Sequence, residues 1–341
     1  YVAYLFADNS SEDADDQMIK CGSYTGTGGS GVTVNLGWEA QWVMVKKSSA
    51  TSDWKLMDNM RGMPTPSGGR SLKANDSAAE GGDSTIRSDS RGFTIYPGST
   101  FDASGTYIYM AIRAPMMKEP EAATDVFGIT TRNVANDNKA PEFRSTFPVD
   151  MAMKKWDTTD PTLIVSRLNQ GKSMQTSTTS AEVNFSSAMF DYNNGWSSNA
   201  TGANTTLHSW MWKRAKGYMD VVCDTRAFTY GTLNHSLGVV PELIIKKNRS
   251  RASTLWDVMP NVSPYDYRYT FYLNDTQAIN GPSGSYWQTA PTDTVFGVNY
   301  SGDGSSNGDT FIYYLFATLA GISKVGSYVG NGSSQTISCG F

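Results

Sequence analysis

The chain has 341 residues, of which 39% are hydrophobic and 18% are charged, and its formal net charge is −4. This composition is ordinary for a folded protein, and the length suggests two or three domains of common size, each able to bury its own core. Acidic and basic residues are interspersed, so the sequence lacks the basic stripe that nucleic-acid binding requires. No apolar run reaches the roughly 18 residues of a membrane-spanning helix, so we expect no membrane insertion.

Taken in chain order, the predicted elements are short strands. Apolar runs rich in aromatic and β-branched residues, bounded by Gly, Pro, Asn or Ser, occupy residues 32–36, 42–46, 107–112, 163–165, 243–245 and 311–316. Such runs are typical of strands. The best helical candidate, residues 77–80, is one turn at most. Short strands separated by turns favour antiparallel sandwiches or barrels, so the predicted fold class is all-β.

These strands belong to a repeated pattern. Matching segments pair residues 1–7 with 311–317, 22–28 with 326–332, 36–46 with 237–247, and, more weakly, 148–155 with 241–247. Trp54 matches Trp256 at a spacing of 202 positions, and Asn75 matches Asn274 at a spacing of 199. Self-similarity of this kind indicates an array of similar modules.

The matches divide the chain into six predicted segments. They are the closing strand of a preceding repeat (1–20), a first β-sandwich repeat (21–118), a linker (119–146), a divergent central β unit (147–216), a second β-sandwich repeat (217–320) and the first strand of a following repeat (321–341). The linker begins beside Pro115 and Pro120, which break the strand pattern. In the central unit, residues 170–174 stand where the other repeats have Asn-Asp-Ser or Asn-Asp-Thr.

The cysteines are odd in number, and two of them recur with the repeat. Cys21 and Cys223 lie 202 positions apart, which places them at equivalent points of two repeats. Residues at equivalent points of separate modules are not natural disulfide partners. We therefore predict free, strand-buried thiols.

The motifs together resemble a known family. A G-S-Y-T-G strand at 22–26, L-G turns at Leu36 and Leu237, the segment W-Q-T-A-P-T-D-T-V-F-G-V at 287–298 and the closing strand at 311–317 are similar to a repeat of tail-fibre-like virion proteins of marine tailed phages. Lectin-like jelly-roll modules often accompany that repeat. The resemblance covers residues 1–117 and 217–341.

The resemblance implies a structural and adhesive segment of a phage tail fibre or other virion appendage. Such a segment lies on the surface of an extracellular particle, contributes to attachment to the host surface and self-associates, with a homo-trimer as the expected state. Other virion proteins and a host-surface glycan are the implied partners. The family motif carries no catalytic residue that transfers to this chain.

Two alternatives come from other classes of protein. A carbohydrate-binding adhesin would show exposed aromatic residues at equivalent positions of every repeat. A capsule-degrading glycosidase would carry two carboxylates across one cleft. The sequence holds only two histidines, His208 and His235, and it lacks the common nucleophile, metalloprotease and phosphate-loop motifs. We therefore predict that the chain is not an enzyme and needs no metal or cofactor.

Other polar groups are weak candidates for binding. The acidic run Glu12, Asp13, Asp15 and Asp16 is interpreted as a solvated loop, with a calcium site as the alternative, and residues 301–309 as a flexible turn. The aromatic loop at 191–196 is the remaining candidate for a ligand site, because aromatic faces stack on sugars. Its residues Tyr192, Asn194 and Trp196 are the candidate ligand-binding residues, and a turn with one packed Trp is the alternative.

Overall fold

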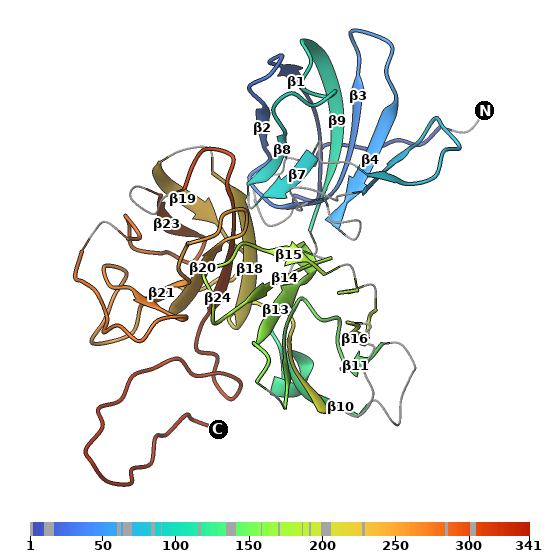
Figure 1. Cartoon of the computed structure of the whole chain (residues 1–341). Helices are drawn as coiled ribbons and strands as arrows, with labels where there is room; N and C mark the ends of the chain where they lie inside the picture. Colours follow the sequence, from blue (N-terminus) through green and yellow to red (C-terminus); the bar gives the residue numbers. More distant parts are fainter. Residues whose placement is uncertain are drawn as a thin grey trace. The chain divides into compact units, whose positions relative to one another are not determined.

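The computed structural model describes residues 3–9, 17–59, 63, 70–82, 86–89, 91–114, 117–133, 141–157, 159–169, 171–185, 187–190, 192–198, 206–226, 229–283, 286–300 and 305–341. Within these residues the chain is built of strands β1 to β24 with short 3-10 turns, which confirms the predicted all-β class. The chain divides into two compact units, residues 1–116 and 117–341 (Figure 1). None of the described helical segments has the length and apolar character of a membrane span.

The N-terminal unit is a sandwich of a large and a small antiparallel sheet. The large sheet contains, in spatial order, β1 (Ile19–Gly26), β9 (Gly105–Arg113), β3 (Ala40–Lys47), β4 (Trp54–Asp58), β5 (Arg70–Lys73) and β6 (Gly81–Gly82). The small sheet contains β2 (Val32–Asn35), β8 (Gly92–Ile95) and β7 (Ile86–Asp89). Phe93 and Ile95 of the small sheet pack with Val43, Val45 and Tyr107 of the large sheet in one buried core.

The second compact unit holds two more large sheets. The central sheet contains β10 (Phe127–Asn133), β17 (Thr206–Trp212), β12 (Met151–Trp156), β13 (Leu163–Ser166), β14 (Lys172–Gln175) and β15 (Val183–Asn184). The C-terminal sheet contains β18 (Met219–Thr225), β24 (Thr310–Phe316), β20 (Leu243–Asn248), β21 (Asp257–Pro260) and β22 (Phe271–Tyr272). Each is accompanied by a two-stranded sheet, β11 (Phe143–Arg144) with β16 (Gly195–Trp196) and β19 (Tyr230–Asn234) with β23 (Val295–Asn299).

All three repeats share one strand order. In each large sheet the first strand of the repeat pairs with its last strand, and the third, fourth and fifth strands follow in turn. The registers also agree, because the last strands place Ile108, His208 and Ile312 opposite Lys46, Lys155 and Lys247 respectively. The divergent central unit therefore has the sheet order of its neighbours. The jelly-roll connectivity stays a prediction.

The strand β10 lies inside the segment predicted as a linker, 119–146. Residues Phe127–Asn133 pair with β17 along their whole length and supply the first strand of the central repeat. The G-S-Y-T-G motif is absent from this strand, so the sequence pattern did not mark it. Residues 125–129 are similar in sequence to 294–298, but the first segment enters β10 of a large sheet and the second enters β23 of a small sheet.

Neither predicted terminal strand forms in the described residues. Residues 3–9 and 326–341 carry no strand assignment, and Tyr4, Leu5 and Tyr328 are 83%, 92% and 69% exposed. A strand exists only where a neighbouring strand accepts and donates its backbone hydrogen bonds. The sequence of these two segments has the strand pattern, but no strand among the described residues pairs with them.

The cysteine positions differ from those inferred from spacing. None of the three cysteines forms a disulfide, as expected, but only Cys223 is buried, whereas Cys21 and Cys339 are exposed. Cys21 stands opposite Met110, and the equivalent partner in the C-terminal sheet, Tyr314, stands opposite Val221. Cys21 therefore corresponds to Val221, two residues before Cys223. A shift of two residues keeps the side chain on the same face of a strand.

Candidate functional site: a contact between two repeats

Within the second compact unit, the central and C-terminal large sheets pack face to face. We call the face of each large sheet that is turned away from its own core its second face. One apolar cluster joins the two second faces and contains Met151, Ile164, Met174, Met219, Val221, Cys223, Trp256, Ile312 and Tyr314. Two further clusters lie on the opposite faces of these sheets. Each of these two repeats therefore buries a core of its own, as expected, and the two also share one.

Trp256 anchors this contact. Its side chain is fully buried, and its Nε1–H donates to the backbone oxygen of Gln175 on β14 at 3.1 Å. The ammonium of Lys247 lies 5.8 Å from the centroid of the Trp256 ring. A large aromatic ring with a polar atom that reaches a partner is well suited to join two sheets.

A repeated side-chain bond holds the tryptophan in place. The backbone N–H of Trp256 donates to Asn274 Oδ1 at 2.9 Å, and the backbone N–H of Trp54 donates to Asn75 Oδ1 at 2.8 Å. The matched Trp and Asn residues of the sequence thus form one structural unit. In the central sheet Ile164 stands opposite Met174, so the counterpart of Asn75 is Ser177 and not the segment 170–174.

A buried ion pair joins the two repeats at this contact. Arg249, which is 1% exposed, binds Glu182 through Nε–Oε2 at 2.8 Å and Nη2–Oε1 at 3.3 Å. The backbone N–H of Glu182 also donates to the oxygen of Arg249 at 2.8 Å. Two parallel side-chain bonds and one backbone bond fix both chain segments, which are 67 residues apart.

Lys247 precedes Arg249 by two residues in the chain and is fully buried. Burial lowers the pKa of its ammonium to about 8, although Asp257 opposes the shift. Its Nζ donates to the backbone oxygen of Thr179 at 3.3 Å and to Thr254 Oγ1 at 3.0 Å. These bonds link the C-terminal sheet to the loop before β15 of the central sheet.

The candidate ligand residues do not form one surface. Trp196 is fully buried between the rings of Phe143 and Phe190, at centroid distances of 5.0 and 5.6 Å, and its Nε1–H donates to Ser209 Oγ at 2.9 Å. A ring in this position offers no face to a sugar. Tyr192 is half-buried and Asn194 is exposed, so only these two remain accessible.

The two histidines lie in different repeats, and each contacts structural partners. His235 is buried, its Nε2 lies 3.1 Å from the backbone oxygen of Thr292, and its Nδ1 accepts the N–H of Leu237 at 3.2 Å. This arrangement fits the neutral imidazole, and burial lowers the pKa of His235 accordingly. His208 is half-buried in β17, with Nδ1 3.1 Å from Thr131 Oγ1.

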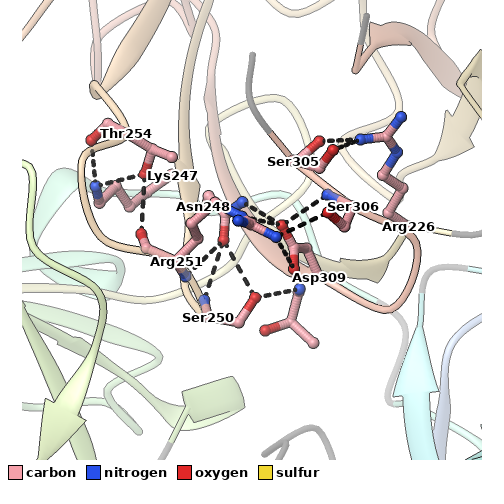
Figure 2. A network of polar contacts seen from close by, with 10 residues as sticks. Arg226, Lys247, Asn248, Ser250, Arg251, Thr254, Ser305, Ser306 and Asp309 are labelled. Carbon is pink, nitrogen blue, oxygen red and sulfur yellow. Dashed lines mark hydrogen bonds and ion pairs between the residues drawn. The ribbon is translucent and has the colours of Figure 1, made fainter. Parts of the chain in front are cut away.

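Asp309 ends the segment 301–309 and organises a polar network at one end of the C-terminal sheet. Its Oδ2 accepts bonds from Arg251 Nε at 2.8 Å, Ser306 N–H at 3.0 Å and Asn248 Nδ2 at 3.1 Å (Figure 2). Arg226 reaches the backbone of Ser305 in the same network. The carboxylate thus holds this turn to the strand ends. Residues 301–304 lie outside the described residues.

The carboxylate run Glu12, Asp13, Asp15 and Asp16 also lies outside the described residues. Among those the structure describes, no group of three or more His, Cys, Asp or Glu side chains is arranged to hold a metal ion.

The fold and this contact define a class of protein, an all-β array of similar sandwich repeats in which the central and C-terminal large sheets pack on one another. A comparison with protein families matches residues 1–115 and 143–341 to a family described as domain of unknown function (DUF7483). The match covers most of the chain, which therefore belongs to this family. A comparison with curated proteins found no match.

Sequence reasoning found Trp256 as a repeated residue but missed its ion-pair neighbours. Arg249 and Glu182 are single charged residues far apart in the chain, and no spacing rule connects them. The sequence feature that could have indicated the contact was the strand at 311–316, in which apolar residues do not alternate with polar ones. A strand of that kind is typical of a sheet covered on both faces.

Proposed function

We propose that the chain is a structural and adhesive segment of a virion appendage such as a phage tail fibre, and that it contributes to attachment at the host surface. The observation that carries this proposal is the shared core between the central and C-terminal repeats. Repeats that bury their sheet faces against one another form a stiff array, in which stability is the sum of the repeats and their contacts. An extended projection needs that property.

The use of the polar groups supports the same proposal. The ion pair of Arg249, the carboxylate of Asp309 and the imidazole of His235 each bind neighbouring segments of the fold. Groups held in this way serve the architecture. The exposed Asn194 and the half-buried Tyr192 leave one loop of the central repeat open to a host-surface molecule.

Electron microscopy of the particle that contains this chain tests the proposal, with gold-labelled antibodies against residues 217–320. We expect label along an elongated projection of a virion. Label found only on compact protein that is not attached to a virion would contradict the proposal. Release of reducing ends from host polysaccharide by the purified chain would instead favour the capsule-degrading alternative.

A further inference from the structure

The loop that follows β21 carries tyrosines that have no counterpart in the other two repeats. It spans residues 261–270, between β21 and β22, and is orange in Figure 1. Its tyrosines are Tyr265, Tyr267 and Tyr269. The matching loops of the N-terminal and central repeats, residues 59–69 and 167–171, contain no aromatic residue. Since all three repeats share one sheet order, that order does not depend on these rings.

The three rings have two different environments. Tyr267 packs against the buried core of the C-terminal repeat. Tyr265 and Tyr269 are half-buried and meet edge to face, with ring centroids 5.3 Å apart and an angle of 68° between the ring planes. In the part of the chain that the structure describes, their hydroxyls form no hydrogen bond, whereas the hydroxyls of the core residues Tyr24 and Tyr300 do. Tyr265 and Tyr269 therefore keep their hydroxyls and part of each ring available to another molecule.

A charged pair belongs to the same loop. Asp266 and Arg268 have side chains that are 35% and 50% exposed, and they bind each other through Oδ1–Nε at 3.0 Å and Oδ2–Nη2 at 2.6 Å. The Nη1 group of Arg268 makes no bond to a described residue. A guanidinium offers five N–H donors and a carboxylate about four acceptor sites, so this pair can still bind donors and acceptors of a ligand.

Backbone bonds fix the loop in one conformation. The N–H of Tyr269 donates to the oxygen of Asp266 at 3.0 Å. Thr270 and Asn280 exchange two backbone bonds, at 2.9 and 2.7 Å, which holds the chain after β22 alongside the loop. The ring of Tyr269 lies against Gly281, where an added Cβ would come within 2.9 Å of the ring atom Cδ1. A ligand that binds to such a loop does not have to order it first, which favours affinity.

We propose that Tyr265, Asp266, Arg268 and Tyr269 form a binding site for a neutral sugar unit of a glycan. A pyranose ring combines apolar C–H faces with hydroxyl groups that donate and accept hydrogen bonds. The two aromatic rings suit the C–H faces, and the phenol hydroxyls and the charged pair suit the hydroxyl groups.

The charge of the site decides between classes of sugar. The guanidinium of Arg268 and the carboxylate of Asp266 neutralise each other, so the loop has no net charge that would attract an anionic ligand. A neutral sugar therefore fits better than a sulfated or acidic one. This inference gives the ligand class for the proposed attachment function, and its role in the virion rests on that function.

Calorimetric titration of the full chain with three neutral polysaccharides, namely dextran, mannan and galactan, tests the proposal, and dextran sulfate is the anionic comparison. We expect a neutral polysaccharide to bind with an affinity that about 0.5 M NaCl leaves unchanged, since salt screens only charged contacts. Tyr265→Ala and Tyr269→Ala should each weaken binding about tenfold, because a stacking ring is lost. Tyr269→Phe keeps the ring against Gly281 and should weaken binding less. Tyr230→Ala removes a tyrosine of the same repeat that is 63% exposed, and it should leave binding unchanged.

Three outcomes would overturn the proposal. A folded chain that binds none of the three neutral polysaccharides has no such site. Binding that both Tyr265→Ala and Tyr269→Ala leave unchanged takes place at another surface. Preferred binding of dextran sulfate, abolished by salt, would assign the surface to an anionic ligand. Circular dichroism of each variant separates lost binding from lost folding. Each of these outcomes leaves the labelling of virions unaffected, so the proposed function is tested independently.

Discussion

Removal of the Trp256 side chain is the sharpest test of the contact between the central and C-terminal repeats. The ring is fully buried, and its Nε1–H binds the oxygen of Gln175 across the contact. Substitution of a buried Trp by Ala costs about 3–5 kcal/mol in free energy of unfolding, because a cavity remains. The lost hydrogen bond adds about 1 kcal/mol. This loss is a large part of the about 5–15 kcal/mol that stabilises a typical domain.

Trp54 is a matched control within the same chain. It has the same backbone bond to an asparagine, but its side chain is only half-buried and its sheet contributes to a separate core. We expect Trp54→Ala to cost about 1–2 kcal/mol, since less apolar surface is lost from burial. Both variants should be compared with the unsubstituted chain at one protein concentration.

Hydrogen exchange read by mass spectrometry in increasing urea is the suitable assay, because it reports the two compact units separately. In Trp256→Ala we expect faster exchange in β14 of the central sheet as well as in β21, with β3 and β9 unchanged. Equal losses for the two variants, or a loss in Trp256→Ala confined to the C-terminal sheet, would refute the view that this ring joins the sheets.

Three further predictions concern charged groups. Arg249→Leu leaves Glu182 buried without its cation and should cost about 3–5 kcal/mol, while the double variant with Glu182→Leu should recover most of that loss in urea denaturation. Burial lowers the pKa of Lys247 to about 8, below its unfolded value of about 10.4. Between these two values the unfolded chain binds more protons than the folded chain, so the free energy of unfolding should rise from pH 8 to pH 10. Thermal melts of Lys247→Met should lack that rise. Burial alone would raise the pKa of Asp102, but hydrogen bonds led by those from Thr27 lower it to about 2. The ionised carboxylate should therefore stabilise the folded N-terminal unit above about pH 4, and this stabilisation should be lost toward pH 2. Asp102→Asn should flatten that acid dependence and destabilise the N-terminal unit at pH 7.

Much of the fold follows from patterns that act over short distances along the chain. The apolar runs at 42–46, 107–112 and 311–316 fall within β3, β9 and β24, because alternation and turn residues are local properties of a strand. The repeat was visible in the Trp and Asn matches, since the same local bond selects the same two residues in both repeats. The central repeat was harder to recognise, because its first strand β10 lacks the motif that marks β1.

The candidate site was less predictable. Trp196 had the sequence features of an exposed binding loop, yet Phe143 and Phe190 enclose it in a core. Register alone showed that Cys21 corresponds to Val221, because pairing with the last strand, and not spacing along the chain, sets the position of each side chain.

The sequence by itself determined the strand class, the repeats and the residues that recur in them, because these depend on periodicity and on local hydrogen bonds. Only the tertiary structure decided which faces are occupied. Ile108 and Ile312 match in sequence, yet one is 42% exposed and the other is fully buried. The difference arises because burial of a sheet face depends on a partner sheet, and that partner comes from residues far away in the chain.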